Sequence, residues 1–224
     1  MTASVQRSAI ADREQVLRAF LDGEKSQISA ACHAMSRAFS RGATLLVFGT
    51  GAAETDAAHV AVEFMHPVIV GKRALPALAP PNDVLALMQP GDIAIGLDEG
   101  AAEFVAAARR RGLLTLSFDA GDADFEFSVP TEDPFVRQEV HETTYHVLWE
   151  LVHVFFEHPG LLDDACITCG DVAVEARVVA VRNGSAVVEK DGLREEVAVE
   201  LVNDVGVGDV LLCHAGVALE KLPA

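Results

Sequence analysis

An apolar stripe with a helical period runs through the first forty residues of the chain. Its apolar members are separated by polar residues, as on a helix with one face turned to a core. The stripe predicts a helix from about Ser8 to Arg41, and Gly42 ends it. Its members are Ile10, Val16, Leu17, Phe20, Ile28 and Ala31.

Four short apolar runs then alternate with segments of helical pattern. The turn Gly49-Thr50-Gly51 leads into one such segment, and others extend from Glu103 to Arg111 and from about Asp133 to Glu157. Strands that alternate with helices predict an α/β fold, a parallel sheet sandwiched between helices in three layers. Ligands of such sheets bind at the carboxyl ends of the strands, where the Gly49-Thr50-Gly51 turn falls. The predicted strands are Ala43–Gly49, Asp92–Leu97, Leu113–Phe118 and Phe125–Val129.

The pattern changes at His158-Pro159-Gly160, beyond which the helical period is absent. Short runs with alternating valines follow, separated by glycine-containing turns, and predict a small OB-like β-barrel. We therefore expect a first domain over residues 1–158, a linker over 159–165 and a barrel domain over 166–224. The predicted barrel strands are 172–181, 186–189, 195–202 and 210–213.

Composition narrows the class of protein. The chain has 17 basic and 34 acidic residues, which argues against nucleic acid or an anionic membrane as a partner. No apolar run reaches the length of a membrane span, and the first residues lack the apolar core of a signal peptide. The four cysteines, Cys32, Cys166, Cys169 and Cys213, are too scattered for a disulfide framework. We expect a cytoplasmic protein.

Two histidine-containing segments about eighty residues apart predict one metal site. His59 and Glu63 are four apart on a helix, so they project from one face. Gln138 and His146 are eight apart on a second helix. If the helices lie side by side, two imidazoles, a carboxylate and an amide oxygen can converge, a ligand set that suits zinc or another divalent first-row metal. The alternative is two amphipathic helices whose histidines cap or pack.

The segment of about residues 5–157 resembles the sugar-isomerase (SIS) fold, which is flavodoxin-like, and within it the phosphoheptose isomerase family. The resemblance implies zinc bound by His59, Glu63, Gln138 and His146. It also implies aldose–ketose isomerisation around an enediol, with Glu63 as general base and His146 as general acid. Relatives of this kind are homo-oligomers, so we expect a tetramer or a dimer. The matching stretches are Gly49–Gly51, Asp56–His59, Glu63, Gly91–Gly96, Gln138–His141 and His146.

The chain departs from that family where phosphate binds. The family has an Asn-Gly-Gly-Ser stretch where this chain has Thr50-Gly51-Ala52-Ala53, so Ala53 replaces a serine. In the next loop, Asp98 and Glu99 replace hydroxyl residues, and each would repel a phosphate by about 1 kcal/mol or more. We therefore expect a metal site with a different, sugar-like ligand. The predicted ligand-binding loop comprises Gly49, Thr50, Gly51, Asp98 and Glu99.

The second domain resembles the small hydrogenase-maturation chaperones of the HupF/HypC type. In that family a cysteine helps to hold an iron–cyanide–carbonyl unit destined for a [NiFe] hydrogenase, so the resemblance points to Cys166 or Cys169, with His214 as a further candidate. A thiolate is a suitable soft ligand for such iron. Alternatives are an inert cysteine pair and a histidine that only closes a strand end. The matching stretches are 166–169, 176–181, 186–188, 194–197, 201–205, 207–216 and 218–222.

Two functions from different classes follow. The first, which we favour from the sequence, is a [NiFe]-hydrogenase maturation factor whose barrel binds maturation proteins or the hydrogenase large subunit through a cysteine. Its SIS domain would provide oligomerisation and a metal or small-ligand site. The second is a zinc-dependent aldose–ketose isomerase acting on a sugar or sugar phosphate.

Overall fold

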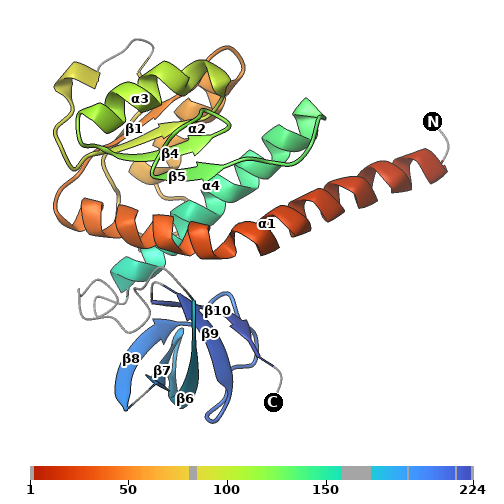
Figure 1. Cartoon of the computed structure of the whole chain (residues 1–224), viewed down its shortest axis with the longest axis vertical. Coiled ribbons are helices and arrows are strands. Elements are labelled where there is room, and N and C mark those ends of the chain that lie inside the picture. Colours follow the sequence, from red (N-terminus) through yellow and green to blue (C-terminus); the bar gives the residue numbers. More distant parts are fainter. Residues whose placement is uncertain (1–2, 81–84, 158–172, 191, 215, 223–224) are drawn as a thin grey trace. The chain divides into compact units, whose positions relative to one another are not determined.

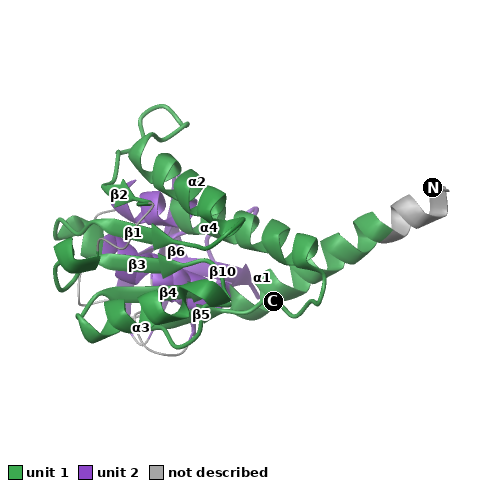
Figure 2. Ribbon diagram, turned by 90° about the horizontal axis from the view of Figure 1, so that it is seen from above, with its two compact units in different colours: residues 1–24, 38–149 green, residues 25–37, 150–224 purple. Residues whose placement is uncertain are grey.

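The computed structural model describes residues 3–80, 85–157, 173–190, 192–214 and 216–222. These residues form two compact units, which are described separately (Figure 2). The first comprises Met1–Glu24 and Ala38–Trp149, and the second Lys25–Arg37 and Glu150–Ala224. No helix in the described ranges is both long and apolar enough to cross a membrane.

The long first helix, α1, extends over Ala3–Ser40. Phe20, Ile28 and Ala31 of the predicted apolar stripe are buried, as a helix with one face toward a core requires, whereas Ile10, nearer the start of the helix, is exposed. The chain leaves the helix at Gly42, whose φ of +92° is a conformation that glycine adopts without strain.

The first unit contains a five-stranded sheet in the order β2-β1-β3-β4-β5, with every neighbouring pair parallel. The central strands are buried on both faces, which explains why their sequences are continuously apolar. The predicted α/β fold with a parallel sheet is therefore confirmed. The strands are β1 Leu45–Phe48, β2 Ala77–Leu78, β3 Ile93–Gly96, β4 Leu114–Phe118 and β5 Phe125–Phe127.

Helices cover the sheet (Figure 1). Helix α2, Ala53–Met65, contacts β1 and β2, while α3, Ala102–Arg110, contacts β3 and β4. Helix α4 extends over Pro134–Glu157, as its sequence predicts. Two short 3₁₀ helices, η1 Leu85–Leu87 and η2 Glu99–Ala101, precede β3 and α3.

The second unit contains a closed five-stranded barrel in the order β10-β8-β7-β6-β9 (Figure 1). Strand β10 closes it by pairing antiparallel with β9 and parallel with β8. The barrel core is small and apolar, with Val178, Val188, Val197 and Leu211 at its centre. The predicted small barrel is therefore confirmed. Its strands are β6 Val174–Arg182, β7 Ser185–Lys190, β8 Leu193–Ala198, β9 Val210–His214 and β10 Val217–Lys221.

The domain boundary expected near residue 158 stays a prediction. The expected linker, 159–165, lies outside the described residues. The compact units divide α1 and α4 between them, so the second unit contains helical residues as well as the barrel.

Candidate metal centre

The turn between β1 and α2 sets the position of the first candidate ligands. A Cβ on Gly49 would lie 2.5 Å from the carbonyl oxygen of Ala53, so only glycine permits this close approach. Gly51 has a φ of +56°, which again favours glycine. Helix α2 begins directly after this turn, and His59 and Glu63 lie one turn apart on it.

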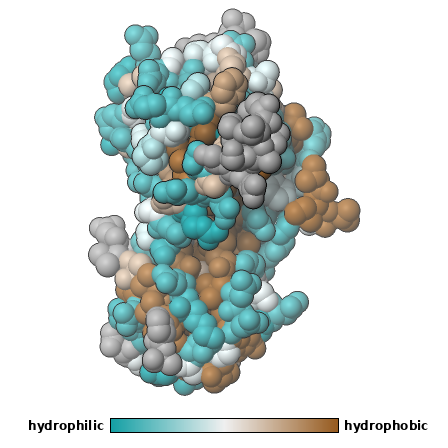
Figure 3. All heavy atoms as spheres, turned by 90° about the vertical axis from the view of Figure 1, so that its right-hand side faces the viewer, coloured by the Kyte–Doolittle hydropathy of each residue, from teal (hydrophilic) through white to brown (hydrophobic). Residues whose placement is uncertain are grey.

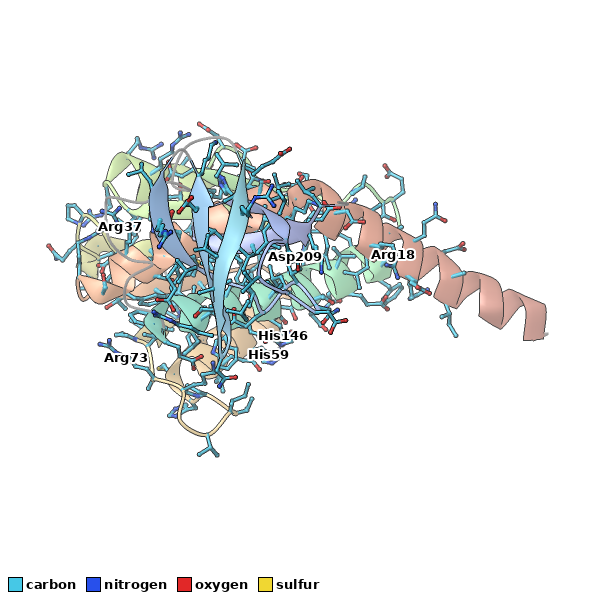
Figure 4. The ribbon with its side chains drawn as sticks, turned by 90° about the horizontal axis from the view of Figure 1, so that it is seen from below. Arg18, Arg37, His59, Arg73, His146 and Asp209 are labelled. Atoms are coloured by element: carbon cyan, nitrogen blue, oxygen red, sulfur yellow. The ribbon has the colours of Figure 1, made fainter. Side chains whose placement is uncertain are left out.

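Three predicted ligands lie together. His59 Nε2 is 3.4 Å from Glu63 Oε1, and His146 Nε2 is 3.5 Å from Glu63 Oε2. One ligand atom of each residue lies within 4.8 Å of the others. The two imidazoles are about half exposed, at 45% and 44%, whereas the carboxylate between them is 18% exposed. Figure 4 shows His59 and His146 close together, and their ring centroids are 5.2 Å apart.

The geometry and donor types of this cluster fit a metal ion. In a tetrahedral site with metal–ligand bonds of about 2.0–2.2 Å, neighbouring ligand atoms are separated by about 3.3–3.6 Å. Each imidazole nitrogen lies at such a distance from a different carboxylate oxygen of Glu63: His59 Nε2 is 3.4 Å from Oε1, and His146 Nε2 is 3.5 Å from Oε2. Imidazole nitrogen and carboxylate oxygen are ligands that zinc and other first-row metals accept. These three residues can therefore hold a divalent first-row ion, with room for further ligands.

Tyr145 contacts His59 from the opposite helix. Its hydroxyl lies 3.2 Å from His59 Nδ1, and the side chain is buried. Burial, with added repulsion from Glu142, Asp56 and Glu63, raises the pKa of the phenol far above its ordinary value, so it stays protonated. A hydrogen bond at Nδ1 leaves Nε2 as the nitrogen that faces the cluster. The sequence analysis missed Tyr145, and its position next to His146 was the only signal.

Trp149 joins the two helices that carry the cluster. Its indole N–H donates to the backbone carbonyl oxygen of Glu63 over 2.9 Å, and the side chain is buried. This bond fixes the register of α4 against α2, so His146 comes opposite Glu63.

Gln138 has a different neighbour in the structure. Its amide nitrogen donates to both carboxylate oxygens of Asp56, over 3.3 and 3.2 Å. The bond again joins α4 to α2. The expected role of Gln138 as a fourth metal ligand stays a prediction.

A cavity of about 420 Å³ opens at the carboxyl edge of the sheet, within the size range of small-molecule sites. Two of its lining residues, Asp56 and Gln138, lie on the helices that carry His59, Glu63 and His146, so the cavity and the candidate metal ligands are at one end of the fold. The predicted loop residues Thr50, Asp98 and Glu99 line it. The remaining lining residues are Ala52, Ala53, Leu97, Gly100, Asp119, Pro134, Arg137 and His141.

Asp98 occupies the hydrogen-bond donors at the end of β1. Its carboxylate accepts a bond of 3.1 Å from the backbone N–H of Thr50 and a second, short bond from the Thr50 hydroxyl. Asp98 stands at the N-cap position of η2, where an aspartate commonly caps its own helix, yet it makes no such bond. Its side chain instead ties the loop after β3 to the loop after β1.

Asp119, His141 and Arg137 form an ion-pair group in the same cavity. Asp119 Oδ2 lies 3.1 Å from His141 Nε2 and 3.6 Å from Arg137 Nε. Burial raises the pKa of Asp119, but the nearby polar side chains of His141 and Ser128 and the charges of His141 and Arg137 outweigh it, so the pKa is lowered overall. Asp119 has a φ of +57°, a left-handed conformation that aspartate tolerates better than most residues. The sequence analysis missed this group.

The candidate residues of the barrel are only partly described. Cys166 and Cys169 lie outside the described residues. His214 is buried, and its backbone carbonyl oxygen accepts a bond of 2.9 Å from the Ser29 hydroxyl of α1. Its expected functional role stays a prediction. Cys213 is buried in the barrel core, and burial raises the pKa of its thiol to about 12.

Comparison with known proteins gives two family matches in separate parts of the chain. Residues 10–117 match the SIS domain family, and residues 172–224 match the HupF/HypC family. A phosphoheptose isomerase of Thermodesulfovibrio yellowstonii is 29% identical over 187 residues, which cover 69% of this chain and 93% of the relative. One from Roseiflexus is 30% identical over 169 residues, with 61% of this chain and 86% of the relative covered.

Solved structures agree on the fold. A phosphoheptose isomerase from Francisella tularensis superimposes with a TM-score of 0.60 at 20% identity, covering 68% of this chain and 99% of that one. One from Neisseria gonorrhoeae gives a TM-score of 0.53 at 21% identity, covering 66% and 98%. At identities of 20% and 21%, these structural similarities are evidence for the fold alone. With the sequence relatives, they show that this chain belongs to the phosphoheptose isomerase family and contains, in addition, a HupF/HypC family segment at residues 172–224.

Proposed function

We propose that the first unit is a metal-dependent isomerase that acts on a hydroxycarbonyl compound, with zinc as the expected metal. The observation that carries the proposal is the convergence of His59, Glu63 and His146 from two helices onto one ion-sized space. Membership in the phosphoheptose isomerase family supports the same chemistry.

The proposed roles follow from the chemistry of the side chains. Aldose–ketose isomerisation moves a proton from the carbon next to a carbonyl, so it needs a base at that carbon and an acid at the oxygen. Glu63 would take the carbon-bound proton and His146 would supply one to the carbonyl oxygen, each when its proton-transferring atom is not bound to the ion. His59 would hold the ion. A bound metal would polarise the carbonyl group and offset the negative charge that develops on its oxygen.

Hydrogenase maturation is the second candidate function, which the sequence analysis ranked first. The HupF/HypC match and the closed barrel support it. In this proposal Cys166 or Cys169 would hold an iron intermediate and bind maturation proteins or the hydrogenase large subunit. We now rank the isomerase first, because its candidate residues have a described geometry and the two cysteines do not. The functions are compatible, since a fused barrel could deliver what the first unit makes.

Metal content tests the first proposal. Purified wild-type protein should contain about one equivalent of zinc or another first-row metal by elemental analysis, and Glu63→Ala should lose it. The matched control is Glu54→Ala, which removes an exposed carboxylate from the same helix and should retain the metal. A wild-type protein that takes up no divalent metal, or a Glu63→Ala variant that keeps it, overturns the proposal.

Cys166→Ala and Cys169→Ala test the second proposal. Loss of hydrogenase activity in cells that carry either variant, with metal content at the first unit unchanged, supports the maturation role. Full hydrogenase activity with the double variant contradicts it.

The ligand class expected for the first unit has its own test, a comparison of turnover rates. If the protein converts sugar phosphates as fast as unphosphorylated sugars, the expected ligand class is wrong.

A further inference from the structure

We propose that the cavity lined by Thr50, Asp56, Asp98 and Glu99 takes an unphosphorylated polyhydroxy compound that carries an amino group. The proposal rests on the function proposed above, because it names the substrate class for the cavity at the same end of the fold as His59, Glu63 and His146, which do not themselves line it. Its basis is that Asp98 already occupies the hydrogen-bond donors of Thr50 and that the carboxylates of Asp56, Asp98 and Glu99 line the cavity.

The hydrogen-bond donors of Thr50, at the end of β1, are not available to an anion. In parallel sheets, backbone N–H groups at the start of the following helix are common phosphate sites. Here the Thr50 N–H and hydroxyl both donate to Asp98. Further along the turn, the N–H groups of Ala53, Glu54 and Thr55 donate to the carbonyl oxygens of Thr50, Gly51 and Ala52, over 3.0, 3.4 and 3.2 Å.

Gly100 makes the contact between Asp98 and Thr50 possible. A Cβ on Gly100 would lie 2.2 Å from Thr50 Oγ1, so any larger residue would push the two loops apart. The loops therefore meet through a glycine and an aspartate.

Arg137, which lines the cavity, already contacts an acidic side chain and a backbone carbonyl oxygen. Arg137 lies 3.6 Å from Asp119 and donates to the carbonyl oxygen of Thr131 over 2.6 Å. Its charge is balanced by Asp119. Three lining carboxylates, Asp56, Asp98 and Glu99, remain without a cationic neighbour among the cavity-lining residues. A positively charged group would offset them, whereas a phosphate would add to their repulsion.

The polar lining also suits hydroxyl groups. Carboxylate oxygens accept hydrogen bonds, and the cavity of about 420 Å³ can hold a compound of sugar size. Gln138 and Asp56, which are bonded to each other, lie in the wall shared with the helices of the metal cluster. A bound polyhydroxy compound would thus extend from the acidic loop toward the proposed metal.

The test compares three probes with the same carbon skeleton and different charge: D-glucosamine, D-glucose and D-glucose 6-phosphate. Calorimetric titration of the zinc-loaded full chain should give the tightest binding for glucosamine, and at least about tenfold weaker binding for the phosphate. Asp98→Asn, which removes one charge, should shrink this preference severalfold. Glu99→Gln, at an exposed position, should do the same and covers the case in which Asp98→Asn fails to fold.

Glu150→Gln is the control, since it removes one charge from an exposed residue outside the cavity and should leave the preference unchanged. Equal affinities for the three probes, tighter binding of the phosphate, or no binding of glucosamine overturns the proposal. Metal content in the same samples separates the two proposals. A protein that holds zinc but prefers phosphate disproves only the ligand class, whereas a protein that holds no metal disproves the proposed function.

Discussion

Spacing along a helix and packing between helices both position the residues of the candidate metal site, His59, Glu63 and His146. His59 and Glu63 are four residues apart, and a helix returns to nearly the same side after four residues, so both side chains lie on one helical face. The contact of Tyr145 with His59 depends on the distance between two helices. No local pattern carries that distance, so the residue that orients His59 could be found only in the structure.

Tyr145→Phe should weaken zinc binding by about tenfold, because a ligand histidine held by a hydrogen bond at its other nitrogen binds metal better. Competition with a chromophoric chelator would measure the affinity. Thr143→Val is the control, since it removes a hydroxyl that bonds only the backbone of its own helix. Equal affinities of Tyr145→Phe and wild type would show that Tyr145 does not position His59.

Asp119→Asn should reduce stability at neutral pH and hardly at all in acid. The folded state lowers the pKa of Asp119, so its charged form stabilises the fold above its ordinary pKa of about 3.9, and this contribution disappears as the pH falls through the lowered value. Loss of the charged contacts with His141 and Arg137 should cost about 1.5–3 kcal/mol, the order of a hydrogen bond to a charged group. Urea unfolding at pH 7 and at pH 3 would measure the difference.

Asp204→Asn is the matched control, because Asp204 also has a positive φ, of 54°, and is exposed. It should change stability little at either pH. A loss at Asp119 that is as large in acid as at neutral pH would mean that packing, and not charge, makes the contribution.

Helices and strands with a clear hydrophobic period were predicted from the sequence. Strands that exist because they pair with a neighbouring strand were not. The helices α1 and α4 and the strands β1, β3, β4 and β5 follow from the hydrophobic pattern. Strand β2 has only two residues and exists because Ala77 and Leu78 pair with β1. Strand β10 has a register shift between Ala218 and Glu220 that breaks its alternation, so its place in the barrel depends on β8 and β9.

Gly100→Ala should separate the loops after β1 and β3. The added methyl group overlaps Thr50 Oγ1, and we expect a loss of about 1–3 kcal/mol, the usual cost of an added group in packed surroundings. Thermal unfolding would measure it. Gly23→Ala is the control, because Gly23 is exposed on α1 with open space around its Cβ position, and alanine should stabilise the helix by up to about 1 kcal/mol. No loss in Gly100→Ala would refute the close contact.

The whole molecule is divided in a way that the sequence does not indicate. Residues 25–37 of α1 form one compact unit with the barrel: Lys25 pairs with Glu220 at 2.9 Å, and Ser29 bonds to the backbone of His214. These contacts join residues about 190 positions apart in the chain, and they assign this part of α1 to the unit that contains the barrel. Local periodicity, which identified α1 as one helix, carries no information on them.

Cys32 and Cys213 should become reactive together during unfolding. Both belong to the second unit and are buried, and burial raises the pKa of each thiol, so the reactive thiolate is scarce in the folded state. Alkylation in increasing urea, with each cysteine peptide quantified by mass spectrometry, should give one midpoint for both. Fluorescence of Trp149, in the first unit, gives a separate reference. Different midpoints for the two cysteines would show that α1 does not unfold with the barrel.

Exposed apolar side chains gather on the loop after α2, at Val68, Ile69 and Val70. Hydrophobic atoms are also seen to project from the surface in Figure 3. Exposed apolar groups of this kind are common at protein contacts. The homo-oligomer expected from the family, a tetramer or a dimer, stays a prediction that light scattering can test.

The sequence alone determined the class of fold, the barrel and the shared helical face of His59 and Glu63. These depend on periodicity and on spacing within single helices, which are local properties. Only the tertiary structure revealed that Asp98 binds Thr50, that Asp119 pairs with His141, and that Tyr145 holds His59. Each of these contacts joins residues on different elements, so each exists only once the chain has brought distant loops and helices together.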